Sequence, residues 1–330
     1  KLSDRSYDKR KAGAAEVEVT IQSLAAKGDT EAITNLLGVL ANDFTRSPRV
    51  FHRKGGLTGL AAAAVALAPE LGTYLHVLVP PVLHCFQDQE SRVRYYACEA
   101  LFNVVKVARS LILPYFNDIF LGICNLLSDL ADSDVKSGAG VLNRKLKDIV
   151  TESEEFDVEA FIPLLRLQIV SANAHVRQLI VGWITALDSV PDIEMLDYLP
   201  EFMGGLFSML GDKNKEIRQQ SYRALAEFLD QINSVQFEVR VNFIPMIDVL
   251  LEQVESEEKF NRVTAMEWLC QFVKLGRNKL IRVLDKLVAA VLKCFSDPAI
   301  EIVEEAERTN ASLLELVSLT TAEFSFGPVV

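Results

Sequence analysis

The stretch DQESRVRYYACEAL, residues 88–101, contains the unit that this chain repeats. Asp88 to Ser91 have the polar composition of a tight turn. Small or apolar residues then recur at the three- and four-residue spacing of a buried helical face: Val93, Ala97, Ala100 and Leu101. A second apolar run, 80–86, comes just before the turn. The stretch therefore predicts two helices joined by a short turn.

The same arrangement returns along the chain at a nearly constant interval. Equivalent anchor residues are Val93, Val135, Val176, Ile217 and Val263, at intervals of 42, 41, 41 and 46 residues. A period of about 40 residues with two helices per unit is typical of HEAT and armadillo repeats, whereas tetratricopeptide and ankyrin units are shorter. One helix pair cannot bury its apolar face alone, so successive pairs stack. The sequence predicts an all-α fold, an α-solenoid of about seven HEAT/armadillo-like helix pairs.

The helices are expected as one opening helix followed by these pairs. The opening helix is expected over 4–27, and the pairs over 30–44 with 52–67, 71–86 with 90–109, 114–130 with 133–150, 156–170 with 173–189, 196–210 with 213–233, 239–255 with 257–275, and 277–295 with 298–319. We predict one solenoid over 1–319, with full repeats from about residue 30, and a poorly ordered or extended tail over 320–330. Because the first residue is Lys1 rather than Met, we expect a fragment of a longer chain.

Composition limits the classes of partner. The chain has 330 residues, half of them hydrophobic, and its net charge is 34 − 45 = −11. This acidity argues against wholesale nucleic-acid binding and against non-specific attraction to an anionic membrane, although local basic patches stay possible. The cysteines are odd in number, form no C-x-x-C pair and lie in apolar helical patterns: Cys85, Cys98, Cys124, Cys270 and Cys294. They predict buried, reduced thiols in a cytosolic protein.

No catalytic motif has a strength comparable to the repeat. The sequence lacks the phosphate-loop, nucleophile-elbow and H-E-x-x-H patterns. His84 and Cys85 are a possible metal-binding pair, but no second pair has ligand spacing, so a packed histidine is favoured. We expect a non-catalytic protein with no cofactor and no metal.

Basic residues recur near the start of the second helices: Arg92, Arg94, Lys136, Arg177, Arg218 and Arg262. Acidic residues recur in or beside the preceding turns: Asp88, Glu90, Asp132, Asp134, Asp212 and Glu216. One interpretation is a basic stripe that binds an acidic partner or phosphate. The other, favoured because both signs recur together, is a ladder of Asp–Arg pairs that links neighbouring units.

Two tyrosines follow the first arginine pair. One of Tyr95 and Tyr96 is expected to be buried and the other to face a groove, where tyrosine is a good interface anchor. The candidate partner-binding residues are Tyr95, Arg94, Arg92, Lys136, Arg177 and Arg218. The basic run at 143–147 is interpreted as a solvated helix face, with a partner or lipid-headgroup contact as the alternative.

Four stretches resemble a known family more closely than generic repeats do. They are HRKGGLTGLAAAAVAL (52–67), SRVRYYACEALFNVVKVAR (91–109), DVKSGAGVLNRKLKDIVTES (134–153) and LDSVPDIEMLDYLPEFMGGLFSMLGDKNKEIRQ (187–219). Together they resemble the N-terminal HEAT-repeat half of the vacuole-morphology scaffold family, over roughly residues 4–235.

The resemblance implies a non-catalytic scaffold of the complex that makes and turns over phosphatidylinositol 3,5-bisphosphate. It implies binding of a PIKfyve-type phosphoinositide kinase through these repeats. A Sac-type phosphoinositide phosphatase would bind mainly through a C-terminal half that this chain lacks. The implied location is cytosolic and peripheral on endosomal, vacuolar or lysosomal membranes, through partners. The alternative from another class is an importin-β-like cargo-binding transport receptor, which binding to a Ran-type GTPase would favour.

Overall fold

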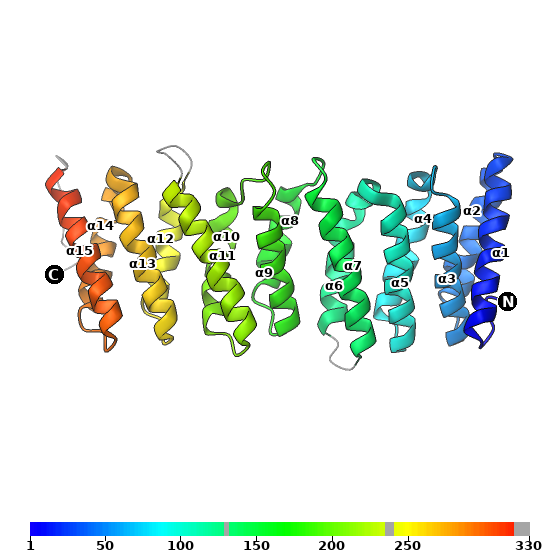
Figure 1. The fold of residues 1–330 in the computed structure, drawn as a ribbon, viewed down its shortest axis with the longest axis horizontal. Coiled ribbons are helices and arrows are strands. Elements are labelled where there is room, and N and C mark those ends of the chain that lie inside the picture. The colour runs from blue at the N-terminus through cyan, green and yellow to red at the C-terminus, as the bar shows by residue number, and fades with distance from the viewer. Residues whose placement is uncertain (129–131, 235–240, 320–330) are drawn as a thin grey trace. The chain divides into compact units, whose positions relative to one another are not determined.

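The computed structural model describes residues 1–128, 132–234 and 241–319, and in these ranges the regular structure is helical, without strands. The predicted all-α solenoid fold is confirmed (Figure 1). Contacts divide the chain into two compact units, Lys1–Val158 and Glu159–Val330, which are described separately. The continuity of one solenoid across this division stays a prediction, and the predicted tail at 320–330 lies outside the described residues.

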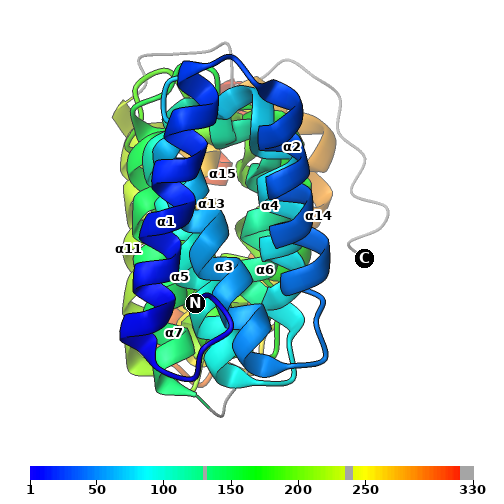
Figure 2. The same ribbon diagram turned by 90° about the vertical axis from the view of Figure 1, so that its right-hand side faces the viewer.

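The first unit is built from two packed rows of helices. Its α-helices are α1 (Tyr7–Ala26), α2 (Thr30–Gly38), α3 (Val50–Ala66), α4 (Leu71–His84), α5 (Ser91–Ala108), α6 (Phe116–Ser128) and α7 (Ser133–Thr151). Between them lie a short π-helix, η1 (Val39–Phe44), and two short 3-10 helices, η2 (Cys85–Gln87) and η3 (Arg109–Tyr115). Helices α1, α3, α5 and α7 contact one another in order, and α2, α4 and α6 form the other row (Figure 2). The first row therefore carries the second helix of each pair.

The second unit repeats this arrangement. Its α-helices are α8 (Val158–Gln168), α9 (Ala174–Asp188), α10 (Met195–Ser208), α11 (Lys215–Ser234), α12 (Phe243–Gln253), α13 (Lys259–Gly276), α14 (Leu284–Cys294) and α15 (Ile300–Leu319). Two short 3-10 helices, η4 (Met209–Gly211) and η5 (Arg277–Val283), lie between them. Helices α9, α11, α13 and α15 pack in order, and α10, α12 and α14 form the other row. Aromatic pairs join the rows: the rings of Phe161 and Trp183 are 5.6 Å apart, edge to face.

The thiols lie inside these rows. All five cysteines are free and buried, as predicted. Burial raises the pKa of Cys85, Cys98 and Cys124 to about 12, so these thiols stay protonated near neutral pH. They pack as small apolar side chains rather than as nucleophiles or metal ligands.

One run, Ser91–Ser128, is long and apolar enough by length and composition alone to cross a membrane. Here it is interrupted as α5, η3 and α6. Many of its apolar side chains, such as Leu101 and Phe120, are fully buried within the first unit, although Leu111 in η3 is exposed. We interpret it as part of a core.

The glycines of α3 permit close packing, as the sequence predicts. A Cβ atom at Gly56 would lie 2.7 Å from the Cβ of Phe44 and 3.0 Å from the backbone nitrogen of Thr45. A Cβ atom at Gly55 would lie 2.1 Å from the carbonyl oxygen of Leu2. Side chains at these two positions would therefore push α3 away from η1 and from the N-terminal segment.

Candidate functional site

Arginines at the start of the second helices pair with aspartates in the turn of the next unit. Nε–Oδ2 distances are 2.6 Å for Arg53–Asp88, 2.7 Å for Arg177–Asp212 and 2.8 Å for Arg262–Asp297. Each pair is separated by 35 residues in the sequence. The constant separation makes this an Arg–Asp ladder, which is the structural interpretation of the recurring charges.

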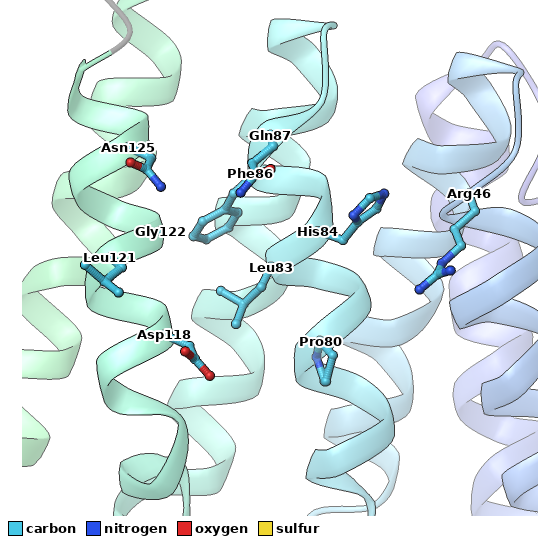
Figure 3. A pocket seen from close by; sticks show the side chains of 10 residues that line it. All are labelled: Arg46, Pro80, Leu83, His84, Phe86, Gln87, Asp118, Leu121, Gly122 and Asn125. Atoms are coloured by element: carbon cyan, nitrogen blue, oxygen red, sulfur yellow. The ribbon is translucent and has the colours of Figure 1, made fainter.

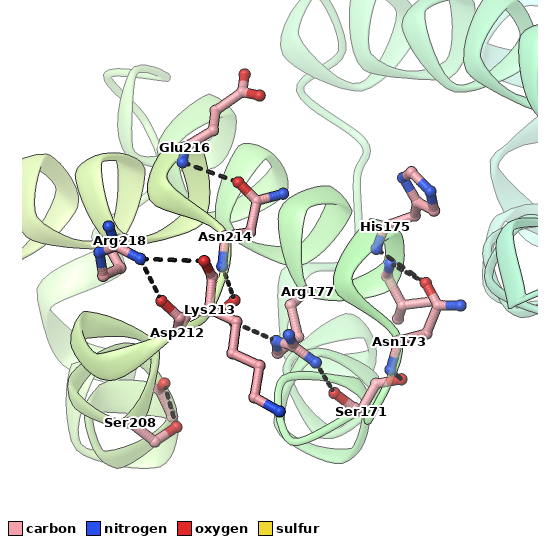
Figure 4. Close-up of polar contacts among 12 residues, drawn as sticks. Ser171, Asn173, His175, Arg177, Ser208, Asp212, Lys213, Asn214, Glu216 and Arg218 are labelled. Atoms are coloured by element: carbon pink, nitrogen blue, oxygen red, sulfur yellow. Dashed lines mark hydrogen bonds and ion pairs between the residues drawn. The ribbon is translucent and has the colours of Figure 1, made fainter.

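These arginines, and Arg218 at the equivalent position, also hold their own turns. Arg177 Nη1 donates to the carbonyl of Ser171 at 2.7 Å, six residues earlier, and Arg218 Nη1 donates to the carbonyl of Asp212 at 2.6 Å (Figure 4). The Asp212 carboxylate, which accepts from Arg177, also accepts the backbone N–H of Asn214 at 2.8 Å. The Asp212 side chain is thus bonded to α9 through Arg177, and its carbonyl is bonded to α11 through Arg218.

Ionisation of the ladder aspartates is favoured. Burial opposes the charge of Asp212, but hydrogen bonds from Arg177 and the Asn214 N–H outweigh it, so the pKa of Asp212 is lowered. The pKa of Asp297 is lowered in the same way, because hydrogen bonds from Arg262 and the Ala299 N–H outweigh burial. The ladder contributes to folding while these carboxyls are ionised.

The ladder separates the candidate residues into two environments. Arg94 is half-buried and donates to the carbonyls of Asp88 and Gln89 at 2.7 and 3.1 Å, so it holds a turn as Arg177 and Arg218 do. Arg92 instead has a side chain 57 % exposed, in an ion pair of 3.0 Å with Asp134 of α7, which is 61 % exposed. Arg92 is therefore much more accessible to a partner.

The remaining candidates are Tyr95 and Lys136. Tyr96 is buried and Tyr95 is half-buried, with ring centroids 6.2 Å apart, so one of the two is buried as expected. That Tyr95 faces a groove stays a prediction. The guanidinium of Arg92 lies 5.6 Å from the ring centroid of Tyr95. Lys136 is half-buried near the start of α7. Arg92, Arg94, Tyr95 and Lys136 thus belong to the first unit.

Around Tyr95 the first unit holds a cationic–aromatic cluster that sequence analysis missed in part. Its members come from α1, α3, α5 and the segment before α1: Arg5, Arg10, Phe51, Lys54, Arg92, Tyr95 and Tyr96. Cation-to-ring distances within it run from 5.5 to 5.9 Å. Such contacts stabilise a cation by about 0.5–2 kcal/mol, depending on burial.

Helix α1 is fastened to this cluster. Arg10 is 4 % exposed, and its Nη2 donates to the Tyr96 hydroxyl at 2.8 Å. Its Nη1 donates to the carbonyls of Asp4 and Arg5, the bond that Arg177 and Arg218 make in their own turns. The repeat spacing could have indicated this role of Arg10 from the sequence, because Arg10, Arg53 and Arg94 lie 43 and 41 residues apart.

The basic run at 143–147 is not a wholly solvated face. Lys147 is half-buried on α7, and burial lowers its pKa to about 8. The expected solvated face is therefore wrong for this residue, because it turns toward the packed side of the helix. Arg144, in the same run, is exposed.

We expect Lys147→Met to raise the free energy of unfolding by on the order of 2 kcal/mol at pH 7. The folded pKa is lowered, so the unfolded chain binds more protons between pH 8 and 10.5, and wild-type stability rises with pH through that window. The variant should lack this rise. Urea unfolding at pH 7 and 10 measures both effects, and an equal gain at both pH values would contradict the burial argument.

The other row carries an open hollow of about 530 Å³ between α4 and α6. Leu83 and Phe86 lie on one side of it, and Leu121 and Gly122 on the other (Figure 3). A Cβ atom at Gly122 would lie 2.7 Å from the Phe86 ring, so the glycine permits this approach. In the described ranges no three histidine, cysteine or acidic side chains cluster as a metal site would require.

Comparisons with known proteins identify a family and a matching region of the chain. A family model described as "Vacuolar 14 Fab1-binding region" matches residues 51–148, from the start of α3 to near the end of α7. The VAC14 homolog of Arabidopsis thaliana is 45 % identical over 329 residues, which is 100 % of this chain and 44 % of that protein. The chain belongs to the VAC14 family.

Other VAC14 relatives agree. Vacuole morphology and inheritance protein 14 of Saccharomyces cerevisiae is 34 % identical over 79 % of this chain and 34 % of its own length. The Schizosaccharomyces pombe VAC14 homolog is 35 % identical over 71 % of this chain and 33 % of its own length. The chain therefore spans less than half the length of these VAC14 relatives.

A solved structure of importin β shares the fold alone. It has a TM-score of 0.52 and 15 % identity, over 96 % of this chain and 41 % of that chain. At this identity the likeness carries no functional argument, so the transport-receptor alternative gains no support. Within the VAC14 family model lie Phe51, Lys54, Arg92, Tyr95 and Tyr96, whereas Arg177 and Arg218 lie outside it.

Proposed function

We propose that this chain is a non-catalytic scaffold that binds a Fab1/PIKfyve-type phosphoinositide kinase through its first unit. The observation that carries the proposal is the match of residues 51–148 to the family's Fab1-binding region. Those residues form α3 to α7, where an exposed arginine and a half-buried tyrosine lie side by side at the start of α5. Arginine and tyrosine are the residue types that most often dominate binding energy in interfaces.

The packed rows supply the rigidity that a scaffold needs. In the first unit the Arg53–Asp88 pair, one rung of the Arg–Asp ladder, joins α3 to the turn before α5, and α5 packs against both α3 and α7. A binding surface spread over α3, α5 and α7 is therefore held in place before a partner arrives. Preorganisation of this kind reduces the entropy cost of association. A kinase held on such a surface would act at high effective concentration on whatever else the full protein holds.

The finer assignments rest on the family resemblance. We propose that the complex controls phosphatidylinositol 3,5-bisphosphate synthesis and turnover at endosomal, vacuolar or lysosomal membranes. A Sac-type phosphatase would bind mainly through parts of the full-length protein outside this chain. The chain's net charge of −11 favours recruitment through partners over direct binding to an anionic bilayer.

We propose Arg92, Arg94, Tyr95 and Lys136 as residues of the kinase-binding surface, with Arg92 and Tyr95 as its accessible anchors. Arg177 and Arg218 stay a prediction for partner contact in the second unit. Arg94 serves less well as a test residue, because its bonds to the carbonyls of Asp88 and Gln89 hold the turn before α5.

The double variant Arg92→Glu, Tyr95→Ala is expected to weaken kinase binding roughly tenfold or more, because it removes an aromatic anchor and reverses a charge. Pull-down of purified kinase with the whole chain measures this effect. The variant should stay folded at the assay temperature, because the exposed ion pair contributes about 0–1 kcal/mol and the half-buried Tyr95 contributes only part of the roughly 1.5–3 kcal/mol of a fully buried side chain. Far-UV circular dichroism at that temperature checks this.

The chain supplies a matched control in its second unit. Lys259 pairs with Glu301 at 2.8 Å across 42 residues, with side chains 54 % and 53 % exposed, and the Arg92–Asp134 pair spans the same 42 residues. Lys259→Glu should leave kinase recovery unchanged. Equal recovery with all three proteins would remove the Arg92–Tyr95 surface from the proposal.

A further inference from the structure

Two cations on the less exposed side of the cationic–aromatic cluster, Lys54 and Arg10, have no carboxylate partner among the described residues. The Lys54 ammonium lies 5.5 Å from the ring centroid of Phe51 and 5.8 Å from that of Tyr96, and no carboxylate of the described residues lies within ion-pair distance. Arg10, whose Nη2 donates to the Tyr96 hydroxyl, has a buried Nε with no hydrogen-bond acceptor among the described residues. The neighbouring Arg53 differs from them, because it forms an ion pair with Asp88.

This placement of Lys54 costs folding stability. Burial lowers the pKa of Lys54, and the nearby charges of Arg10 and Arg92 lower it further, while only Glu90 acts the other way. A neutral side chain of similar length would fill the same space between α1, α3 and α5 without these costs. A charge kept at a cost to folding is typical of a binding residue.

We propose that Lys54 binds a carboxylate of a short acidic segment in the partner kinase, with Phe51 and Tyr95 contacting apolar residues beside that carboxylate. The inference deepens the proposed function and rests on it. An ammonium–carboxylate hydrogen bond in a partly dehydrated site is stronger than a neutral one. Arg10 lies too deep to be reached, and its charge adds to the positive potential at Lys54.

An acidic protein segment fits this site better than a lipid headgroup at a membrane. Lys54 is half-buried between helices, so a protruding side chain can reach it, whereas a bilayer surface would meet the more exposed Arg5 and Arg92 first. The net charge of −11 also repels an anionic bilayer at longer range.

The test compares the whole chain with its Lys54→Met variant, using purified kinase. We expect binding to be roughly tenfold weaker in Lys54→Met, with a flatter dependence of log Kd on log salt, because one charge-assisted contact is lost. The Tm of the variant should equal or exceed that of wild type, so weaker binding cannot be due to unfolding. Lys54→Arg keeps the charge and should keep most of the binding.

The outcomes separate the inference from the proposed function. A failure of the wild-type chain to bind the kinase would contradict both the proposed function and the role of Lys54. Wild-type binding matched by Lys54→Met, or a lower Tm for Lys54→Met, would overturn the role of Lys54 alone. A last experiment measures binding of wild type and Lys54→Met to phosphatidylcholine vesicles with and without phosphatidylinositol 3-phosphate. Wild-type binding to the phosphoinositide vesicles that is lost in Lys54→Met would assign the site to lipid instead.

Discussion

Gly56→Ala is expected to lower the free energy of unfolding by about 1–3 kcal/mol, the usual cost of forcing an extra methyl group into a packed core. The new Cβ would lie 2.7 Å from the Cβ of Phe44, 3.0 Å from the nitrogen of Thr45 and 3.1 Å from the carbonyl oxygen of Leu40. Two of these neighbours are backbone atoms, one of Leu40 in η1 and one of Thr45 directly after it, and backbone atoms cannot rotate away. The helix α3 would have to move as a body.

The same substitution at Gly140 is the matched control. Gly140 lies within α7, and a Cβ there would meet nothing within 4 Å. Gly140→Ala should therefore raise the free energy of unfolding by up to about 1 kcal/mol, because alanine favours a helix more than glycine does. Urea unfolding of both variants measures the difference. Shifts of the same sign would contradict the close approach of α3 and η1.

Arg177→Met is expected to lower the free energy of unfolding by about 3 kcal/mol at pH 7. The substitution leaves the Asp212 carboxylate, whose side chain is only 5 % exposed, without its arginine. It also removes the donor to the Ser171 carbonyl, so one change loosens the contact to the next unit and the turn before α9.

An exposed pair in the same unit provides the comparison. Arg166 and Glu201 lie 2.8 Å apart and are also separated by 35 residues, but their side chains are 62 % and 45 % exposed. Arg166→Met should change the free energy of unfolding by no more than about 1 kcal/mol. Equal losses for Arg166→Met and Arg177→Met would show that burial of the rung is irrelevant.

Low pH should weaken the Arg177–Asp212 pair. The folded pKa of Asp212 is lowered below its ordinary value of 3.8, so its contribution is present above about pH 4 and is lost as pH falls through the folded pKa. The unfolding free energy of wild type should fall in that range more steeply than that of Asp212→Asn. Urea unfolding between pH 2.5 and 6 measures the two slopes, and parallel curves would contradict the assignment.

Much of the fold was predictable because it depends on local pattern. The helical spacing of apolar residues fixed the expected pairs, and the glycines at 55 and 56 indicated close packing before any helix was placed. The alternation of aspartate in the turn and arginine in the helix indicated a ladder. The apolar spacing and the Asp–Arg alternation are repeated about every 40 residues, so one copy supports the next.

The candidate site was less predictable because it depends on side chains brought together across helices. Arg10 and Tyr96 are 86 residues apart, and their hydrogen bond requires α1 to pack on α3 at a particular rotation. Whether Tyr95 or Tyr96 is buried follows from that packing, not from the Tyr-Tyr sequence. In the sequence Lys54 is one more polar residue near a helix start, and only the packing of α3 against α5 brings its ammonium close to the rings of both Phe51 and Tyr96.

Hydrogen exchange of the whole chain, alone and saturated with the purified Fab1/PIKfyve-type kinase, tests the central claim most directly. The account predicts new protection of backbone amides in α3, α5 and α7, within residues 51–148, strongest near the start of α5. Saturating binding with protection confined to residues 159–319, or with none in either unit, would contradict it.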